Sequence, residues 1–147
     1  MKAVVERLQQ LLETGKKSIS NQPESDLLHK PSPIKWSKKE ILGHLVDSAV
    51  NNLQRFTEIQ FESKPYPIRR YNQDELVKAN GYQEAEVNDI LSLWLALNQR
   101  IIEVMKVQSD KTLAYPIILP NGASADLKFL MTDYVDHMEH HLNQIKG

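Results

Sequence analysis

Apolar residues recur at helical spacing in four long segments, and this repeated periodicity restricts the fold more than any other feature of the chain. Each segment carries one apolar face, which a helix keeps out of water by packing it against another element. Four such faces are buried most simply in a four-helix bundle. The sequence therefore predicts an all-α fold with helices of about 17 to 25 residues, in the segments 3–19, 38–56, 85–107 and 127–145.

The last segment combines an apolar stripe with three of the five histidines of the chain. Six apolar side chains fall within roughly 80° of one another on a helix: Leu127, Met131, Tyr134, Met138, Leu142 and Ile145. His141 lies inside the edge of this stripe, and His137 lies one turn earlier on the same side, whereas His140 points away. Because residues four apart stack on a helix surface, His137 and His141 can close on one metal ion.

The second segment begins with a clear helix-start signal. Ser37 can cap the helix, Glu40 can return the hydrogen bond, and Trp36 can pack on Ile41. Between the long helices, residues 62–83 lack a long period apart from one helical turn at 74–79. Residues 113–122 are β-prone and end in a turn signal, which predicts a short extended piece or hairpin, without a sheet, before the last helix.

A line of hydrogen-bonding side chains runs beside the apolar face of the second segment. His44, Ser48, Asn51 and Arg55 share a strip of about 60°, where a solvated face usually carries Lys and Glu. This arrangement is typical of the wall of a polar cleft. We interpret Ser48 as a cleft hydroxyl and not a nucleophile, since only His44 offers a base beside it. Asp47, about 60° from His44 on the polar side, can either orient an imidazole or face solvent, and we expect it to face solvent.

Three imidazoles from two helices, His44 with His137 and His141, have the composition of a three-ligand zinc site that leaves a coordination position open. Iron and nickel also accept imidazole, so the ligand set does not fix the metal. The same histidines also fit a structural reading, in which each one is hydrogen-bonded at the edge of the core. Glu139 does not complete a metalloprotease motif, because it projects to the far side of the helix from His137, roughly 200° round.

Composition excludes several classes of function. The chain has 147 residues, which fits one domain spanning 1–147, and its 18 basic and 19 acidic side chains give a net charge of -1. No basic block favours nucleic acid or an anionic membrane, and no apolar run reaches a spanning length. The early acidic residue Glu6 argues against a signal peptide, so a cytoplasmic location is expected. Cysteine is absent, so any metal site must use histidine, carboxylate or water.

The order and spacing of these motifs resemble the DinB-like superfamily, and within it the YfiT-like group described as metal-dependent hydrolases. The likeness covers nearly the whole chain, and its most specific part is the histidine triplet. The matching stretches are Trp36-Ser37-x-x-Glu40-x-x-x-His44-x-x-Asp47-Ser48-x-x-Asn51-x-x-x-Arg55-Phe56, then Arg70-Tyr71-Asn72-Gln73, then Tyr134-x-x-His137-x-x-His140-His141-x-x-Gln144-Ile145. The chain departs from the family pattern at Ala49, where relatives carry another histidine, and at Asn72, where they often have Asp.

The resemblance implies a bundle of up-down-down-up topology, a divalent metal (Zn²⁺ first, Ni²⁺ as the second choice) on His44, His137 and His141, and a homodimer. It also implies a small-molecule substrate, with Ser48, Asn51, Arg55 and Tyr71 as candidate pocket residues; no catalytic residue is assigned.

Two metal chemistries follow from the resemblance, because the superfamily includes transferases that use low-molecular-weight thiols such as bacillithiol. The first is transfer of such a thiol to an electrophile, which suits a chain without cysteine and is preferred here because no carboxylate is clearly placed as a base. The second is hydrolysis by metal-activated water. A third possibility is a non-catalytic dimeric stress-response or interaction module with structural histidines.

Overall fold

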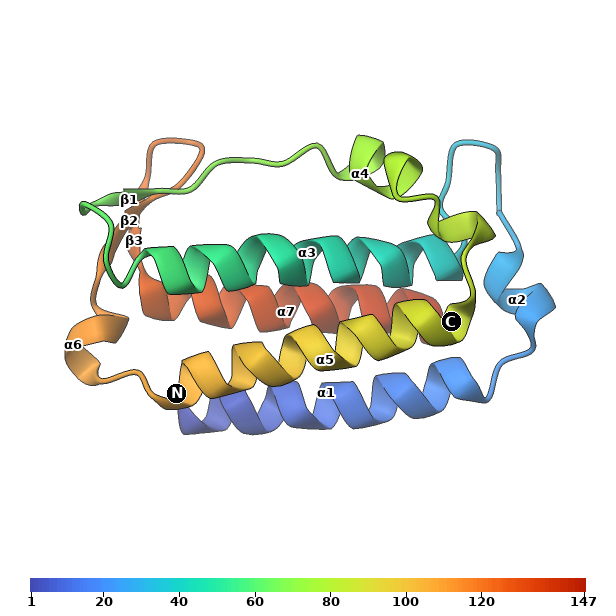
Figure 1. The fold of residues 1–147 in the computed structure, drawn as a ribbon, viewed down its shortest axis with the longest axis horizontal. Coiled ribbons are helices and arrows are strands. Elements are labelled where there is room, and N and C mark those ends of the chain that lie inside the picture. Colours follow the sequence, from blue (N-terminus) through green and yellow to red (C-terminus); the bar gives the residue numbers. More distant parts are fainter.

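Four long helices lie side by side and form most of the molecule in the computed structural model, which describes residues 1–147 (Figure 1). Each helix coincides with one of the four amphipathic segments, so the predicted all-α four-helix bundle is confirmed. None of the helices is both long enough and apolar enough to cross a membrane. The four helices are α1 (Lys2–Ser20), α3 (Lys38–Glu58), α5 (Val87–Lys106) and α7 (Leu127–Lys146).

The bundle has the expected up-down-down-up topology. In Figure 1 the chain runs from left to right in α1, from right to left in α3 and again in α5, and from left to right in α7. Around the bundle, α3 packs on α5 and α7, and α1 packs on the other side of the same two helices. Because α3 and α5 are consecutive long helices that run in the same direction, residues 59–86 must return along the length of the bundle. We call residues 59–86 the crossover.

Apart from α2 (Glu24–Leu28), which lies between α1 and α3, the short helices and strands lie in the crossover and in the connection between α5 and α7. The predicted helical turn is α4 (Gln73–Ala79), which ends before Gly81 with a φ of 61°. The other short elements are β1 (Tyr66–Pro67), the 3-10 helix η1 (Tyr82–Glu84), α6 (Asp110–Leu113), β2 (Pro116–Ile118) and β3 (Ser124–Asp126).

The hairpin predicted before α7 is present, but the expectation that it forms no sheet is wrong. Strands β2 and β3 pair antiparallel, and β1 of the crossover pairs parallel to β2 and makes a small three-stranded sheet. The sequence hides β1 because two residues carry no period. Pro67 also argues against a strand, although proline is tolerated at a sheet edge.

One continuous apolar core runs along the bundle, and the stripe predicted on α7 lies in it. All six predicted residues of that stripe are buried, and Leu130 and Val135 widen it. Trp94 of α5 and Phe56 of α3 are fully buried in the same core. Each such side chain contributes about 1.5–3 kcal/mol of transfer free energy, so the packed faces, more than helix propensity, stabilise the bundle.

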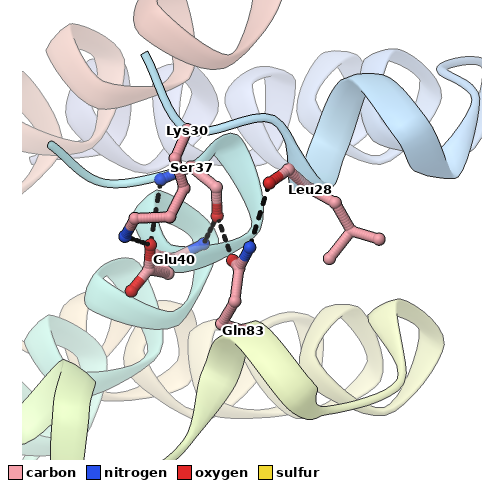
Figure 2. A network of polar contacts seen from close by, with 5 residues as sticks. All are labelled: Leu28, Lys30, Ser37, Glu40 and Gln83. Carbon is pink, nitrogen blue, oxygen red and sulfur yellow. Dashed lines mark hydrogen bonds and ion pairs between the residues drawn. The ribbon is translucent and has the colours of Figure 1, made fainter. Parts of the chain in front are cut away.

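The start of α3 is fixed by a network of polar contacts (Figure 2). The Ser37 hydroxyl accepts from the Glu40 amide at 3.1 Å, and the Ser37 amide donates to Glu40 Oε1 at 3.1 Å, which is the predicted capping box. The same hydroxyl donates to Gln83 Oε1, and Gln83 Nε2 donates to the Leu28 carbonyl. Lys30 forms an ion pair with Glu40. The network ties α3 to the end of α2 and to η1, and fixes the helix two turns before His44.

Candidate metal centre

Three imidazoles from two helices meet at one end of the bundle. His44 comes from α3, and His137 and His141 come from adjacent turns of α7. One nitrogen of each ring lies within 4.8 Å of the others. The ring centroids are separated by 5.1 Å (44 to 137), 4.7 Å (44 to 141) and 4.5 Å (137 to 141). The structure therefore brings together the three histidines that the sequence selected.

The geometry of the helices explains this convergence. His137 and His141 are four residues apart, so they lie one above the other on α7. Because α3 and α7 are antiparallel neighbours, the early turns of α3 lie opposite the late turns of α7 (Figure 1). His44, in the second turn of α3, is thereby placed against the last turns of α7. The closest contact joins the Nε2 atoms of His44 and His137, at 3.1 Å.

Burial keeps these imidazoles neutral. Desolvation, followed by the neighbouring rings of His137 and His141, lowers the pKa of His44 to about 3. Desolvation and the nearby His141 and His140 lower the pKa of His137 to about 4. The pKa of His141 is lowered by burial as well, although its hydrogen bond with Gln144 opposes the shift. At neutral pH all three rings carry free lone pairs, which is the form that binds a metal.

The arrangement of the nitrogens fits a divalent metal ion. At a zinc–nitrogen distance of 2.0–2.1 Å, two ligands of a tetrahedral site lie about 3.3 Å apart, close to the 3.1 Å between His44 and His137. His141 Nδ1 lies 2.8 Å from Gln144 Oε1. With Nδ1 as the donor, His141 keeps its Nε2 lone pair for an ion. His44 Nδ1 is buried and has no hydrogen-bond partner.

The Trp36 ring covers one side of the cluster, with its centroid 4.8 Å from that of His44. His140 is exposed on the outside of α7, as expected, and His29 is exposed at the end of α2. Glu139 does not face the cluster but pairs with Arg7 of α1, which also binds Asp136. No carboxylate belongs to the three-histidine group.

Asp47 is the one residue near the cluster whose expected position is wrong. It was expected to face solvent, but it is 5% exposed and accepts hydrogen bonds from the Tyr82 hydroxyl at 2.6 Å and Asn80 Nδ2 at 2.9 Å. Burial raises the pKa of this carboxyl group, and the two hydrogen bonds oppose the rise. The helical rotation was correct, but the crossover covers this face of α3. Asp47 therefore anchors the crossover to the helix that carries His44.

Three of the four candidate pocket residues meet in a cleft of about 550 Å³ between the C-terminal half of α3 and the crossover. Asn51, Arg55 and Tyr71 line it, and the guanidinium carbon of Arg55 lies 5.4 Å from the centre of the Tyr71 ring. Ser48 is buried, lies outside this cleft, and accepts from Asn52 Nδ2 through its carbonyl. The histidines do not line the cleft. We call it the arginine cleft.

Sequence reasoning missed several residues around these sites. Arg69 and Tyr66 line the arginine cleft, and Tyr82 holds Asp47. All three lie in the crossover, where no period indicates which side chains turn inward. Tyr71 is a candidate pocket residue because of the family resemblance and not because of its spacing.

The model of the DinB superfamily matches residues 2–145 of the chain. No curated protein sequence matches this chain. Among solved structures, the chain is similar to YfiT from Bacillus subtilis, a probable metal-dependent hydrolase with an unusual four-helix bundle topology. The two share 21% identity and a TM-score of 0.87, over 98% of this chain and 82% of YfiT.

Two further structures are similar in fold. A DinB-like protein from Bacillus cereus is 15% identical with a TM-score of 0.67, over 99% of this chain and 87% of the other. The mycothiol-dependent maleylpyruvate isomerase is 10% identical with a TM-score of 0.72, over 98% of this chain, which spans 60% of the isomerase. With the superfamily model covering all four helices, the chain belongs to the DinB superfamily.

Proposed function

We propose that this protein is a divalent-metal-dependent enzyme that transfers a low-molecular-weight thiol, such as bacillithiol, to a small electrophile. His44, His137 and His141 hold the ion, which is Zn²⁺ or Ni²⁺. The convergence of three neutral imidazoles from two helices on one point carries this proposal. The fold is shared with a probable metal-dependent hydrolase and with a mycothiol-dependent isomerase, which supports both the metal and the thiol.

The chemistry follows from the ligand count. An ion with three protein ligands keeps an open position and lowers the pKa of a thiol or water bound there. Residues of the chain support the three ligands of the ion: Gln144 fixes the tautomer of His141, and Trp36 shields His44 from water. In the transfer, the thiol proton passes to solvent, a sulfur–carbon bond forms, and the bond from that carbon to chlorine or to an epoxide oxygen breaks. Chlorine leaves as chloride, and the epoxide oxygen takes a proton from solvent.

The placement of the carboxylates favours a thiol over water as the nucleophile. Glu139 is paired with Arg7, and Asp47 accepts from Tyr82 and Asn80 of the crossover, and no carboxylate belongs to the three-histidine group. A thiol ionises near pH 8.5 without help, whereas bulk water has a pKa of about 15.7. The site therefore suits the nucleophile that needs the weaker base.

Hydrolysis by metal-activated water is the second candidate, and the likeness to YfiT favours it. The two candidates differ in one measurement. The transferase consumes a chlorinated aromatic or an epoxide only when bacillithiol or another small thiol is added. Turnover of an ester or amide without thiol, together with no thiol-dependent consumption, selects hydrolysis.

Metal analysis of purified variants tests the assignment of the ligands. The His141→Ala variant is expected to lose most of its bound metal, because two imidazoles hold zinc far less tightly than three. His140→Ala is the matched control, since His140 is the next residue on α7 and is exposed. Equal metal content in both variants contradicts the assignment. No metal in any of the three proteins leaves the histidines with a structural role and supports the non-catalytic module.

The homodimer belongs to the same proposal. The fold leaves Phe61 and Val107 largely exposed as apolar side chains. Sedimentation velocity at micromolar concentration measures the mass of the particle directly, and a monomer at all concentrations overturns this part.

A further inference from the structure

Three arginines surround the arginine cleft without a carboxylate partner. Arg55 comes from α3, and Arg69 and Arg70 come from the crossover. None of them takes part in the ion pairs of the chain. Two glutamates also line the cleft. Glu58 accepts from neutral donors, Gln54 Nε2 and the Tyr66 hydroxyl, each at 2.8 Å. The cleft therefore holds three cations against two carboxylates.

Arg55 is the most constrained of these cations. It is half-buried, and this burial lowers its pKa, which nearby Tyr71 and Tyr66 only partly offset. One terminal nitrogen donates to Asn52 Oδ1 at 3.4 Å, and the other donates to the Arg69 carbonyl. A guanidinium has five N–H donors, so most of them have no protein acceptor. A desolvated cation held only by neutral groups costs free energy that an anion would offset.

The surroundings of Arg55 extend beyond one hollow. Arg55, Arg70 and Tyr71 also line a second hollow of about 480 Å³, on the side of Asn72 and Asp133. The Arg55 and Tyr71 pair thus stands between the two hollows, and a ligand in either one contacts it. A planar guanidinium beside an aromatic ring is a geometry that binds carboxylate and phosphate with two parallel hydrogen bonds.

The helix also relates the cleft to the histidines. Arg55 follows His44 on α3 by eleven residues, which places it about 16 Å further along the axis and rotated by only about 20°. The two residues therefore lie on the same side of α3, about three helical turns apart.

We propose that the arginine cleft binds the carboxylate or phosphate group of an elongated small molecule, with Arg55 as its principal contact. The length of the molecule rests on the proposed function, because its reactive end must reach the three histidines about 16 Å away along α3. The anion site itself does not rest on it. A thiol or electrophile with an acidic group far from its reactive atom has the required form.

Titration of the metal-free protein with succinate and with inorganic phosphate tests the anion site. Both are added at constant ionic strength, and amide chemical shifts are followed by NMR. Saturable changes are expected in the residues that line the cleft, all of which lie within 51–71. Arg55→Gln is expected to weaken binding by about tenfold or more, the loss of a hydrogen bond to a charged group. The tighter of the two anions identifies the ligand group.

Two further variants make the result decisive. Arg100→Gln changes the net charge equally on the exposed face of α5, outside the cleft, and is expected to bind like the unmodified protein. Arg55→Lys keeps the charge but loses the planar fork, and is expected to fall between the other two. An absence of saturable shifts overturns the proposal, and so does equal weakening by the Arg55 and Arg100 changes.

The metal and anion results can fail separately. Arg55→Gln is expected to keep the full metal content, and His141→Ala is expected to keep anion binding. Anion binding without any metal overturns the proposed enzyme but not the cleft, and metal binding without anion binding does the reverse.

Discussion

At the scale of single residues, the histidine cluster combines burial with the absence of a nearby countercharge. His44 is fully buried, its Nδ1 atom has no protein partner, and its nearest polar neighbour is another imidazole. Such a cluster costs stability in the metal-free protein, because buried polar groups need partners. A bound ion that stabilises only the folded state would offset that cost.

This cost predicts the pH dependence of the metal-free protein. The folded-state pKa of His137 is lowered to about 4 from 6.5, so the unfolded chain binds more protons between these values. The free energy of unfolding is therefore fully retained above about pH 6.5 and falls as the pH drops toward 4. For His137 alone the loss between pH 7 and 5 is about 1–2 kcal/mol.

Urea unfolding at pH 7, 6 and 5 measures this loss in metal-free samples. The His137→Gln variant is expected to show a shallower pH dependence than the unmodified protein, because it lacks one titrating ring. His140→Gln removes only the last of the three causes that lower the pKa of His137, so it is expected to change the slope less than His137→Gln does. Identical slopes in all three proteins would show that His137 is not the source.

A second residue-scale prediction concerns the buried pair between α5 and α7. The Tyr134 hydroxyl donates to Asn98 Oδ1 at 2.6 Å, and both side chains are buried. Tyr134→Phe leaves that oxygen without a donor, which is expected to cost about 1–3 kcal/mol of stability. Chemical denaturation measures the loss. Tyr115→Phe, whose hydroxyl makes no hydrogen bond within the chain, is the control and is expected to change stability little.

At the scale of elements, α3 carries most of the functional side chains and is covered along one face by the crossover. Several contacts hold the cover in place, among them the hydrogen bonds of Asp47 with Tyr82 and Asn80 and the close approach of the Tyr82 ring to Gly43. A Cβ atom added at Gly43 would lie 2.1 Å from that ring. The glycine is therefore needed for the approach of η1 to the helix.

Substitution of Gly43 tests this contact. Gly43→Ala is expected to lower the free energy of unfolding by about 1–3 kcal/mol through overpacking, although alanine favours the helix by about 1 kcal/mol. In a Tyr82→Ala background the clash is gone, so the same change is expected to be neutral or stabilising. A double-mutant cycle measures the difference. Equal effects in both backgrounds would contradict the packing described here.

The elements also show what the sequence can and cannot predict. The four long helices, the capping box at Ser37 and the histidine cluster follow from period and spacing, because a helix turns its residues by a fixed angle. The burial of Asp47 and the strand β1 do not follow from the sequence for one reason: both depend on the crossover, whose place over α3 is set by tertiary contacts. The arginine cleft was predicted in part, since Asn51 and Arg55 lie on a helix but Arg69 does not.

At the scale of the whole molecule, a single apolar core joins all four long helices. With α1 packed on α5 and α7, and α3 packed on the same two helices, no pair of helices can separate without exposing a buried face. A protein of this size with one core is expected to unfold as a single cooperative unit.

Coincident unfolding transitions would support one domain over residues 1–147. Circular dichroism reports the helices, and the fluorescence of a Trp36→Phe variant reports Trp94 in the centre of the core. The midpoints in urea are expected to agree. A fluorescence transition clearly separated from the loss of helix would show that part of the bundle unfolds independently.

The parallel course of α3 and α5 has a consequence for how such a protein can diversify. The chain must travel back along the outside of the bundle between them, and that return stretch supplies most of the wall around Arg55. The three histidines, in contrast, lie on the long helices α3 and α7. Insertions or replacements within 59–86 would thus remodel what the surface recognises while the nitrogen donors stay where the bundle puts them.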